Sequence, residues 1–370
     1  MHRKDEMINN SENPNNRCNK KIALTGGGSA GHVMLHIALL PEMQQRGWDI
    51  YYIGSKGIEK KIIEKTNIPF YTIATGKLRR YFSIHNFLDI FKIFLGLIQC
   101  LKIFIFHRPN ILFSKGGFVS VPPAIAAWLL KIPVITHESD VTPGLANRIL
   151  LYFSKRMLYS FPETNRYLPK RKSEFVGSVV RDELLTGEKK KGLQYCSFDA
   201  DDLRPIVLIM GGSQGAEKIN RVIEQSLAEL NKAYRIIHIA GKGKRNSHPN
   251  SNSYVSFEFV SDELKHLFAA CDMVISRAGA NSIFEILALK KPMLLIPLDV
   301  GSRGDQIINA KSFQKNHWAM ILSERKLNQR TLLESLNALK REAPEMISAQ
   351  MKHSSSLSKE RIFEVIETYL

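Results

Sequence analysis

Two glycine-rich turns, one in each half of the chain, are the residues whose types and spacing first suggest chemistry. Residues Gly26–His32 have the sequence GGGSAGH and follow the apolar run Lys21–Thr25. Residues Gly211–Gly215 have the sequence GGSQG and follow the apolar run Ile206–Met210. A glycine turn between a strand and a helix exposes backbone N–H groups at the helix N-terminus, which suits a diphosphate. The alternative is that both are tight structural turns, since glycine also permits positive φ.

Several kinds of chemistry are disfavoured by what accompanies the two turns. Neither turn ends in the Lys-Ser or Lys-Thr pair of a P-loop, so we do not expect ATP chemistry. A dinucleotide site needs an acidic residue near the end of the second strand, whereas Asp49 stands at the start of Asp49–Ile53. No Asp-x-Asp directly follows a predicted strand, and no cluster has metal-ligand spacing. We therefore expect no cofactor and no metal ion.

The elements that must position the two turns form a repeated pattern. Short apolar runs alternate with helical segments, which indicates a parallel sheet covered by helices on both faces. The pattern restarts after residue 204. We therefore predict an α/β protein of two doubly wound, Rossmann-like domains that face each other across a cleft. The predicted strands are Lys21–Thr25, Asp49–Ile53, Phe70–Thr72, Ile111–Ser114, Val134–His137, Met157–Ser160, Ile206–Met210, Arg235–Ala240, Tyr254–Phe259, Met273–Ser276 and Met293–Pro297.

Composition sets the expected limits of the two domains. The polar, Asn-rich segment 1–20 has no apolar core, so we predict a disordered tail rather than a signal peptide or an anchor. Residues 21–182 form the predicted N-terminal domain, and residues 183–344 form the C-terminal domain. We interpret the charged stretch 182–204 as the linker between them.

The last segment, 345–370, is predicted to be helical. Pro344 stands where proline is favoured, just before the first helical turn. This helix could cap the second domain or cross back to the first, and both arrangements fit the sequence.

The formal net charge of +17 favours a polyanionic partner, which could be nucleic acid, anionic lipid or a phosphorylated substrate. Segment Asn86–His107 is long enough to span a membrane, but Asp89, Lys92 and Lys102 interrupt it. Its apolar residues recur at helical steps, and the preceding Lys77–Phe82 (KLRRYF) interleaves basic and aromatic residues. This pattern is typical of a monotopic membrane contact. The alternative is a buried helix covering a sheet, preceded by a solvated loop.

Seven motifs, in order along residues 21–320, resemble those of the MurG family of bacterial transferases, which have the GT-B fold. The resemblance implies inverting transfer of N-acetylglucosamine from UDP-N-acetylglucosamine to the C4 hydroxyl of undecaprenyl-pyrophosphoryl-MurNAc-pentapeptide, a step of peptidoglycan synthesis. The motifs are Gly26–Leu35 (GGGSAGHVML), Ser114–Pro123 (SKGGFVSVPP), His137–Asn147 (HESDVTPGLAN), Gly177–Arg181 (GSVVR), Gly211–Asn220 (GGSQGAEKIN), Ser276–Glu285 (SRAGANSIFE) and Asp305–Ala310 (DQIINA).

The resemblance implies that the C-terminal half binds the donor diphosphate. Ser213 would hydrogen-bond the diphosphate beside the backbone N–H groups of Gln214 and Gly215, although Ser213 could equally cap a helix. Arg181 would add a cation to the same phosphates, where an ordinary surface arginine is the alternative.

The same resemblance implies residues that recognise the ribose and the sugar. Glu285 would accept the ribose hydroxyls, whereas without the motif it would be interpreted as a solvated helix residue. Gln306, with Asn309 nearby, would bind the sugar hydroxyls, and helix capping is the alternative for both.

On the acceptor side, Ser29, Ala30 and Gly31 form the turn that would face the lipid-linked sugar. His32 is the candidate catalytic base, because its imidazole titrates near neutrality and could take the proton of the attacking hydroxyl. The alternative is a histidine that only hydrogen-bonds backbone at a helix start. Glu138, at the end of a predicted strand, is the rival base.

The chain departs from the family pattern at two places. The first turn has Ser-Ala-Gly where many relatives have Thr-Gly-Gly, which keeps a hydroxyl and a small residue. Asp140 stands where many relatives have asparagine, and a carboxylate beside an acceptor diphosphate would be unfavourable. The resemblance implies that Asp140 binds the substrate, and this departure from the family pattern puts that role in question.

The resemblance implies a peripheral protein on the cytoplasmic side of the cell membrane, in contact with anionic lipid and not with nucleic acid. Two enzymes of the same architecture are the alternatives, a UDP-N-acetylglucosamine 2-epimerase and a diacylglycerol glucosyltransferase. An epimerase would turn over the donor without an acceptor. The motifs SKGGFVS and HESD weigh against the glucosyltransferase. A scaffold protein without activity is a third possibility, which the intact Ser213, Glu285 and Gln306 disfavour.

Overall fold

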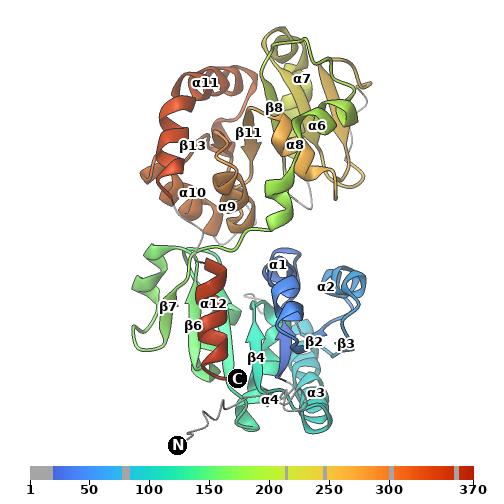
Figure 1. Ribbon diagram of the computed structural model, residues 1–370, viewed down its shortest axis with the longest axis vertical. Helices are drawn as coiled ribbons and strands as arrows, with labels where there is room; N and C mark the ends of the chain where they lie inside the picture. Colours follow the sequence, from blue (N-terminus) through green and yellow to red (C-terminus); the bar gives the residue numbers. More distant parts are fainter. Residues whose placement is uncertain (1–19, 77–83, 213–215, 245–247, 300–303, 354–357) are drawn as a thin grey trace, which may run out of the picture.

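Two parallel β-sheets divide the chain into an N-terminal and a C-terminal half. In Figure 1 the N-terminal half lies at the bottom and the C-terminal half at the top. The computed structural model describes residues 20–76, 84–212, 216–244, 248–299, 304–353 and 358–370. The predicted tail, apart from Lys20, and the basic-aromatic segment Lys77–Phe82 lie outside the described residues. Helices surround the sheet in each half (Figure 1).

The first sheet has, among the described residues, seven strands in the order β3-β2-β1-β4-β5-β6-β7, and all neighbouring pairs are parallel. The six predicted strands are confirmed to within one residue at each end, and β7 was not predicted. The strands are β1 (Lys21–Thr25), β2 (Asp49–Gly54), β3 (Phe70–Thr72), β4 (Ile111–Ser114), β5 (Val134–Glu138), β6 (Arg156–Tyr159) and β7 (Ser173–Phe175).

The second sheet repeats this topology with six strands in the described part of the chain, in the order β10-β9-β8-β11-β12-β13. All of its pairs are parallel as well. In both sheets the strand order reverses beside the first strand, so the glycine turns after β1 and β8 lie at the two switch points, where open sheets bind ligands. The strands are β8 (Ile206–Met210), β9 (Arg235–Ile239), β10 (Tyr254–Phe257), β11 (Met273–Ser276), β12 (Met293–Leu295) and β13 (Met320–Ile321).

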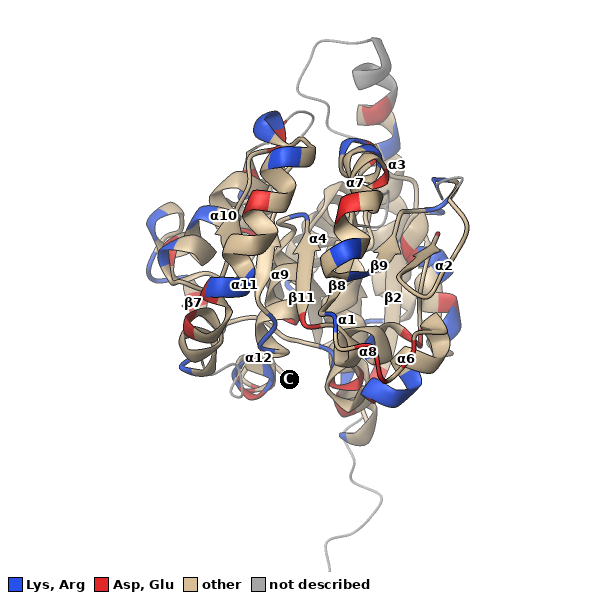
Figure 2. Ribbon diagram, turned by 90° about the horizontal axis from the view of Figure 1, so that it is seen from above, with Lys and Arg blue, Asp and Glu red and all other residues tan. Residues whose placement is uncertain are grey.

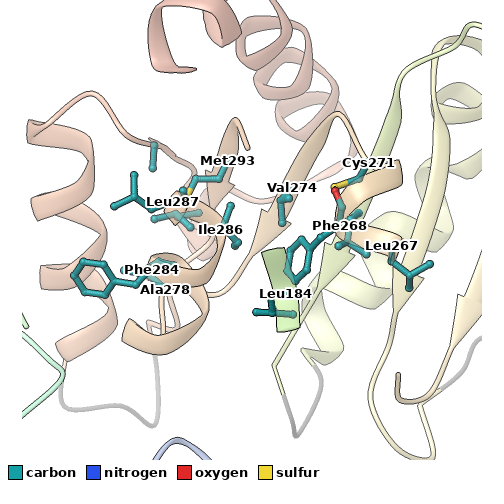
Figure 3. Close-up of a cluster of buried hydrophobic side chains, with 14 of the residues drawn as sticks. Leu184, Leu267, Phe268, Cys271, Val274, Ala278, Phe284, Ile286, Leu287 and Met293 are labelled. Carbon is teal, nitrogen blue, oxygen red and sulfur yellow. The ribbon is translucent and has the colours of Figure 1, made fainter. Parts of the chain in front are cut away.

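The central strands of each sheet are buried on both faces because successive residues within them are apolar. Ile22 and Leu24 enter one apolar cluster, while Ala23 between them enters the cluster on the opposite face. In β8, Leu208 and Ile209 divide in the same way between two clusters. Figure 3 shows one C-terminal cluster, in which side chains from α8 and α9 meet β11. Continuous burial of this kind is what a parallel sheet requires, and the predicted α/β fold is confirmed.

The helices of the two halves cover these faces. Figure 2 shows basic and acidic residues mixed along α7, so this helix has no continuous basic stripe. The helices are α1 (Gly31–Gln45), α2 (Ile58–Ile63), α3 (Ile84–Phe106), α4 (Val121–Leu129), α5 (Leu145–Phe153), α6 (Lys189–Cys196), α7 (Glu217–Ala233), α8 (Leu264–Ala270), α9 (Ala280–Ala288), α10 (Asp305–Lys315), α11 (Gln329–Met351) and α12 (Ser358–Glu367).

The charged stretch 182–204 is not a linker, and that interpretation was wrong. It contains the short 3-10 helix Asp182–Thr186 and α6, and Leu184, Cys196 and Phe198 are buried in the C-terminal core. The lysines of α6 are exposed, which made an element of the domain resemble a solvated connection.

The prediction that Pro344 begins the last helix was also wrong. Pro344 lies inside α11, which continues to Met351 because Met346 and Gln350 in its last turns are buried. The final helix, α12, lies against the N-terminal sheet in Figure 1 and buries Phe363 in the N-terminal core. There the ring of Phe363 meets Trp48, and Arg46 stacks on it with 4.3 Å between the guanidinium and the ring centroid.

Helix α3 is buried on one face and exposes large apolar side chains on the rest of its surface. Cys100 and Phe104 are fully buried against the N-terminal sheet, as expected for a covering helix. Large apolar side chains on the rest of its surface are exposed, including Phe91, Phe94 and Phe106 at 60–71%. A search of the described residues finds no helix with the length and apolar character needed to cross a membrane.

Candidate active site

The first glycine turn is filled from within the N-terminal half by Glu59 of α2. This side chain is fully buried, and its carboxylate accepts hydrogen bonds from the backbone N–H of Gly28 at 3.3 Å and of Ser55 at 3.0 Å. A carboxylate therefore already occupies a place where a bound phosphate would meet the turn. Sequence reasoning missed Glu59, since a lone glutamate in the charged segment IEKKII carries no signal.

A second pair of glycines, after β4, locks this turn in place. Gly116 and Gly117 both have positive φ, at 85° and 82°. A Cβ on Gly117 would clash with the carbonyl oxygen of Gly27 and lie 3.0 Å from Nδ1 of His32. Only glycine allows the two turns to approach so closely.

His32 stands in the first turn of α1, where its ring orientation is fixed. Its Nδ1 lies 2.9 Å from the carbonyl oxygen of Gly27 and 3.0 Å from Oγ of Ser29. Because a carbonyl only accepts hydrogen bonds, Nδ1 carries the proton and Nε2 carries the lone pair. This is the tautomer that a general base working through Nε2 requires. Ser29 is exposed, and Ala30 precedes the helix in a helical conformation.

Glu138 ends β5 with both carboxylate oxygens engaged. Oε1 accepts the backbone N–H of Asp140 at 2.9 Å, and Oε2 accepts that of Gly144 at 3.0 Å and the side-chain amide of Asn147 at 2.8 Å. The side chain is 5% exposed. Its contacts organise the segment Glu138–Asn147, which makes it a less suitable base than His32.

Lys115 and His137 form a buried pair beneath this segment. Nζ of Lys115 lies 2.8 Å from Nδ1 of His137 and also donates to the hydroxyl of Ser139. Burial lowers the pKa of Lys115 to about 8, and burial with the nearby Lys115 charge lowers the pKa of His137 well below its usual value. His137 is therefore neutral and accepts the hydrogen bond of the ammonium.

Direct contacts join the two halves at these turns. The side-chain amide of Asn281, in the first turn of α9, donates to the carbonyl of Gly31 at 3.0 Å. Arg181 Nε donates to Oε1 of Glu285 at 2.9 Å. Burial raises the pKa of Glu285, and the Arg181 charge opposes that shift. A cavity of about 10 Å³ at this interface is lined by Asn281, by Arg181 and Glu285, and by Lys115.

Asn309 and Asp140, both predicted to bind substrate, contact each other across the interface. Asn309 is fully buried, and its amide donates to Oδ1 of Asp140 at 2.9 Å while its oxygen accepts the N–H of Val141 at 3.1 Å. Gln306, one turn earlier in α10, accepts the backbone N–H of Leu298 at 3.0 Å. The structure therefore brings Asn309 into contact with the segment Glu138–Asn147 of the other half.

Three glycines of the C-terminal half face open space in the described part of the chain. A Cβ built on Gly212, Gly279 or Gly304 would meet no atom within 4 Å among the described residues. Gly212 follows β8 and Gly279 follows β11, at the carboxyl ends of these strands, and Gly304 directly precedes α10. Ser213, Gln214 and Gly215 lie outside the described residues.

Two doubly wound sheets, joined where Asn281 at the start of α9 contacts Gly31 of the first turn, have the arrangement that defines the class of the protein, a glycosyltransferase of the GT-B fold. MurG from Acinetobacter baumannii has the same fold, with a TM-score of 0.74 at 23% identity over 94% of this chain and 99% of that one. The UDP-GlcNAc 2-epimerase from Neisseria meningitidis matches with a TM-score of 0.66 at 13% identity, over 94% of this chain and 99% of that one. At these identities the likeness concerns the fold alone.

Sequence comparison narrows the class to a family. Residues 22–159 match the glycosyltransferase family 28 N-terminal domain, and residues 206–366 match its C-terminal domain. The UDP-N-acetylglucosamine–N-acetylmuramyl-(pentapeptide) pyrophosphoryl-undecaprenol N-acetylglucosamine transferase of Oceanobacillus iheyensis is 49% identical over 355 residues, 95% of this chain and 99% of the relative. The enzyme of the same name from Clostridium novyi is 48% identical over 352 residues, 94% of this chain and 98% of the relative. The chain therefore belongs to glycosyltransferase family 28 and is a glycosyltransferase, as the resemblance to MurG implied.

Proposed function

We propose that this enzyme transfers N-acetylglucosamine from UDP-N-acetylglucosamine to the C4 hydroxyl of undecaprenyl-pyrophosphoryl-MurNAc-pentapeptide, with inversion. The names of the relatives at 47–49% identity support both substrates. The observation that carries the assignment of the two substrates to the two halves is the contrast between their glycine turns. The first turn already holds the carboxylate of Glu59, whereas the turn at Gly212 is open in the part that the structure describes. An incoming diphosphate fits the open turn.

Donor binding would exchange partners between two groups that now satisfy each other. Arg181 and Glu285 form an ion pair in which both side chains are mostly buried, at 18% and 13% exposure. In the complex, Arg181 would turn to the diphosphate while Glu285 accepts the ribose hydroxyls, so that neither charge is left buried without a partner. Ser213, Gln214, Gly215 and Gln306 would complete the donor site.

The acceptor hydroxyl would meet His32 at the filled turn. A rigid platform suits this role, because proton transfer requires the base within hydrogen-bond reach of the attacking hydroxyl. Ser29, Ala30 and Gly31 would line the same side, and the segment Glu138–Asn147 would hold the acceptor. In this assignment Asp140 acts through its contact with Asn309 and not on the acceptor diphosphate.

The exposed apolar surface of the N-terminal half supports a peripheral position on the cytoplasmic face of the cell membrane. Besides α3, helix α4 exposes Trp128 and Leu129 at its end. Arg108 reaches the carbonyl of Leu130 at 3.0 Å and places a cation beside these side chains. Apolar residues flanked by cations suit the interface of an anionic bilayer. Phe91→Glu and Phe94→Glu together should reduce binding to vesicles containing anionic lipid, without lowering the affinity for UDP.

The alternatives considered from the sequence are not favoured by the comparisons. The epimerase shares the fold at 13% identity, whereas the transferases that act on the undecaprenol-linked acceptor are 47–49% identical across nearly the whole chain. The acceptor segments that disfavoured a diacylglycerol glucosyltransferase occupy the interface, at Lys115 and at Glu138–Asn147.

The deciding experiment is radiolabelled transfer from UDP-N-acetylglucosamine to a short-chain analogue of the lipid-linked muramyl acceptor. We expect labelled product only when donor and acceptor are both present. Conversion of the donor alone would identify an epimerase instead. A crystal with UDP bound in the first turn, and not in the second, would overturn the assignment of the two halves.

A further inference from the structure

Arg277 is a buried cation in the motif SRAGANSIFE to which the proposed reaction assigns no role so far. It directly follows β11 and stands two residues before Gly279, which faces open space in the described part of the chain. Its side chain is 10% exposed and forms an ion pair with Glu324, which is 12% exposed. A buried ion pair often stabilises a fold no more than apolar residues of the same size would. What the pair holds in place is therefore its more informative property.

The pair holds both ends of the four-residue segment 296–299, which follows β12. At the first end, Nη1 of Arg277 donates to the carbonyl of Ile296 at 3.0 Å. At the other end, Oε2 of Glu324 accepts the backbone N–H of Asp299 at 3.3 Å. A guanidinium suits this double contact, because its several N–H donors have a fixed, planar arrangement that can serve a carbonyl and a carboxylate together.

Gln306 is bound to the middle of this segment. Its side-chain oxygen accepts the backbone N–H of Leu298 at 3.0 Å. Because a backbone N–H only donates, the oxygen of the amide must face Leu298, and its NH₂ group lies on the side away from this contact. An NH₂ group is a donor, which suits the oxygen of a sugar hydroxyl. The orientation of Gln306 therefore depends on where the segment holds Leu298.

The pair is also connected to α7, the helix that follows the second glycine turn. Nζ of Lys218, near the start of α7, donates to the backbone carbonyl of Glu324. At the same end of the segment, Oδ2 of Asp299 accepts from the hydroxyl of Ser323 at 3.4 Å and lies 3.5 Å from Nε of Arg325. Residues that follow β11 and β12 thus meet the start of α7 around one buried ion pair.

We propose that Arg277 is a positioning residue for the donor sugar: through its ion pair with Glu324 it holds segment 296–299 so that Gln306 presents its NH₂ group to a hydroxyl of N-acetylglucosamine. The inference rests on the proposed function, because it assumes that Gln306 binds the sugar. It deepens that function by separating recognition of the sugar from recognition of the nucleotide. The diphosphate and the ribose would still be bound by the second glycine turn, Arg181 and Glu285.

This separation predicts which kinetic constants Arg277→Lys changes. Lysine keeps a positive charge for Glu324, but its single ammonium lacks the planar fork that also holds the carbonyl of Ile296. At saturating acceptor, we expect kcat/KM for UDP-N-acetylglucosamine to fall about tenfold, the effect of losing one well-placed hydrogen bond. The inhibition constant of UDP, which carries no sugar, should change by less than about twofold.

A double-mutant cycle with Gln306→Ala tests whether Arg277 acts through Gln306. Gln306→Ala alone should also lower kcat/KM for UDP-N-acetylglucosamine about tenfold. In that background, Arg277→Lys should cause less than about a twofold further loss, because the side chain that it positions is no longer present. Independent effects would multiply to about 100-fold, and that result would overturn the proposal.

Arg235→Lys is the matched control. Arg235 lies in the same half, is 4% exposed and donates to two backbone carbonyls, that of Arg204 at 3.2 Å and that of Asp199 at 2.6 Å. It begins β9, whereas the glycine turn follows the end of the parallel strand β8, so it lies at the opposite end of the sheet. We expect Arg235→Lys to change neither kcat/KM for the donor nor the inhibition constant of UDP.

Failure of the proposal is distinguishable from failure of the proposed function. If the wild-type protein makes no product from the donor and the muramyl acceptor, the proposed function is wrong and the inference falls with it. If product is made, an unchanged kcat/KM in Arg277→Lys overturns the role of Arg277, as does an equal weakening of UDP.

Should Arg277→Lys not fold, Glu324→Gln takes its place. The amide keeps the size of the Glu324 side chain but removes the ion pair with Arg277. We expect kcat/KM for UDP-N-acetylglucosamine to fall about threefold with the inhibition constant of UDP unchanged. An unchanged kcat/KM in this variant would overturn the proposal.

Discussion

The two glycine turns have similar sequences and opposite surroundings. The turn after β1 packs against its own half, with the Glu59 carboxylate on the amide of Gly28 and Gly117 against the carbonyl of Gly27. The turn after β8 leaves Gly212 facing open space in the described part of the molecule. In the first turn, glycine permits close packing that gives His32 a rigid support. In the second, the described part of the turn leaves space beside Gly212.

The largest effect is expected from a substitution of His32, which tests whether the first turn carries the catalytic base. We expect His32→Ala to lower kcat by a factor of roughly 10²–10⁴, the range for loss of a general base. The affinity for UDP, measured by calorimetry, should be unchanged because the donor binds in the other half. A small effect here, together with a larger loss in Glu138→Gln, would transfer the role of the base to Glu138.

The donor side is tested by Glu285→Ala. We expect the donor KM to rise about 10- to 100-fold, since in the proposed complex the carboxylate would accept charged hydrogen bonds from the ribose hydroxyls. Glu183→Ala is the control: Glu183 also contacts Arg181, at 3.0 Å, but is 63% exposed and lies outside α9. Unchanged donor affinity in Glu285→Ala would revive the interpretation of the protein as an inactive scaffold.

Most of the fold could be predicted from the sequence, because buried parallel strands are continuous apolar runs between turns. The two strands that were missed, β7 and β13, are short edge strands of three and two residues, with little apolar signal. The lysine-rich α6 was taken for a linker because its exposed face dominates its composition. In each case the local sequence reflects mainly the solvent-exposed residues of the element, whereas the element is stabilised by packing against residues that are distant in the sequence.

Less of the site could be predicted, because its partners are far apart in the chain. Motifs identified His32, Arg181 and Glu285, but nothing indicated that the last two pair across 104 positions. Asn309 contacts Asp140 across 169 positions, which turned two expected ligand residues into an interdomain contact. Such pairings arise only when both halves have folded.

The filling of the first turn is tested by Glu59→Gln. The amide would place a donor group where the carboxylate now accepts N–H groups, so we expect the free energy of unfolding to fall by about 1–3 kcal/mol. The loss should appear in denaturant titration, with UDP affinity unchanged. Glu64→Gln is the control, because Glu64 is 55% exposed and its 3.5 Å contact with Lys60 contributes little. Reduced UDP affinity in Glu59→Gln would mean that the donor binds at the turn after β1, and it would overturn the assignment of the donor to the turn after β8.

The smallest expected effect is that of removing divalent ions. The departing UDP needs positive charge, and in the proposed complex Arg181 and the helix N-termini of the donor side would supply it. Within the described ranges, no group of three His, Cys, Asp or Glu side chains is placed to hold a metal. We therefore expect a chelator to change kcat and donor KM by less than about twofold. Complete loss of transfer, with recovery on adding Mg²⁺ or Mn²⁺, would mean that an ion bound with the donor performs the task assigned to Arg181. In that case Arg181→Ala should have only a small effect on kcat, so the two measurements together decide which cation stabilises the leaving group.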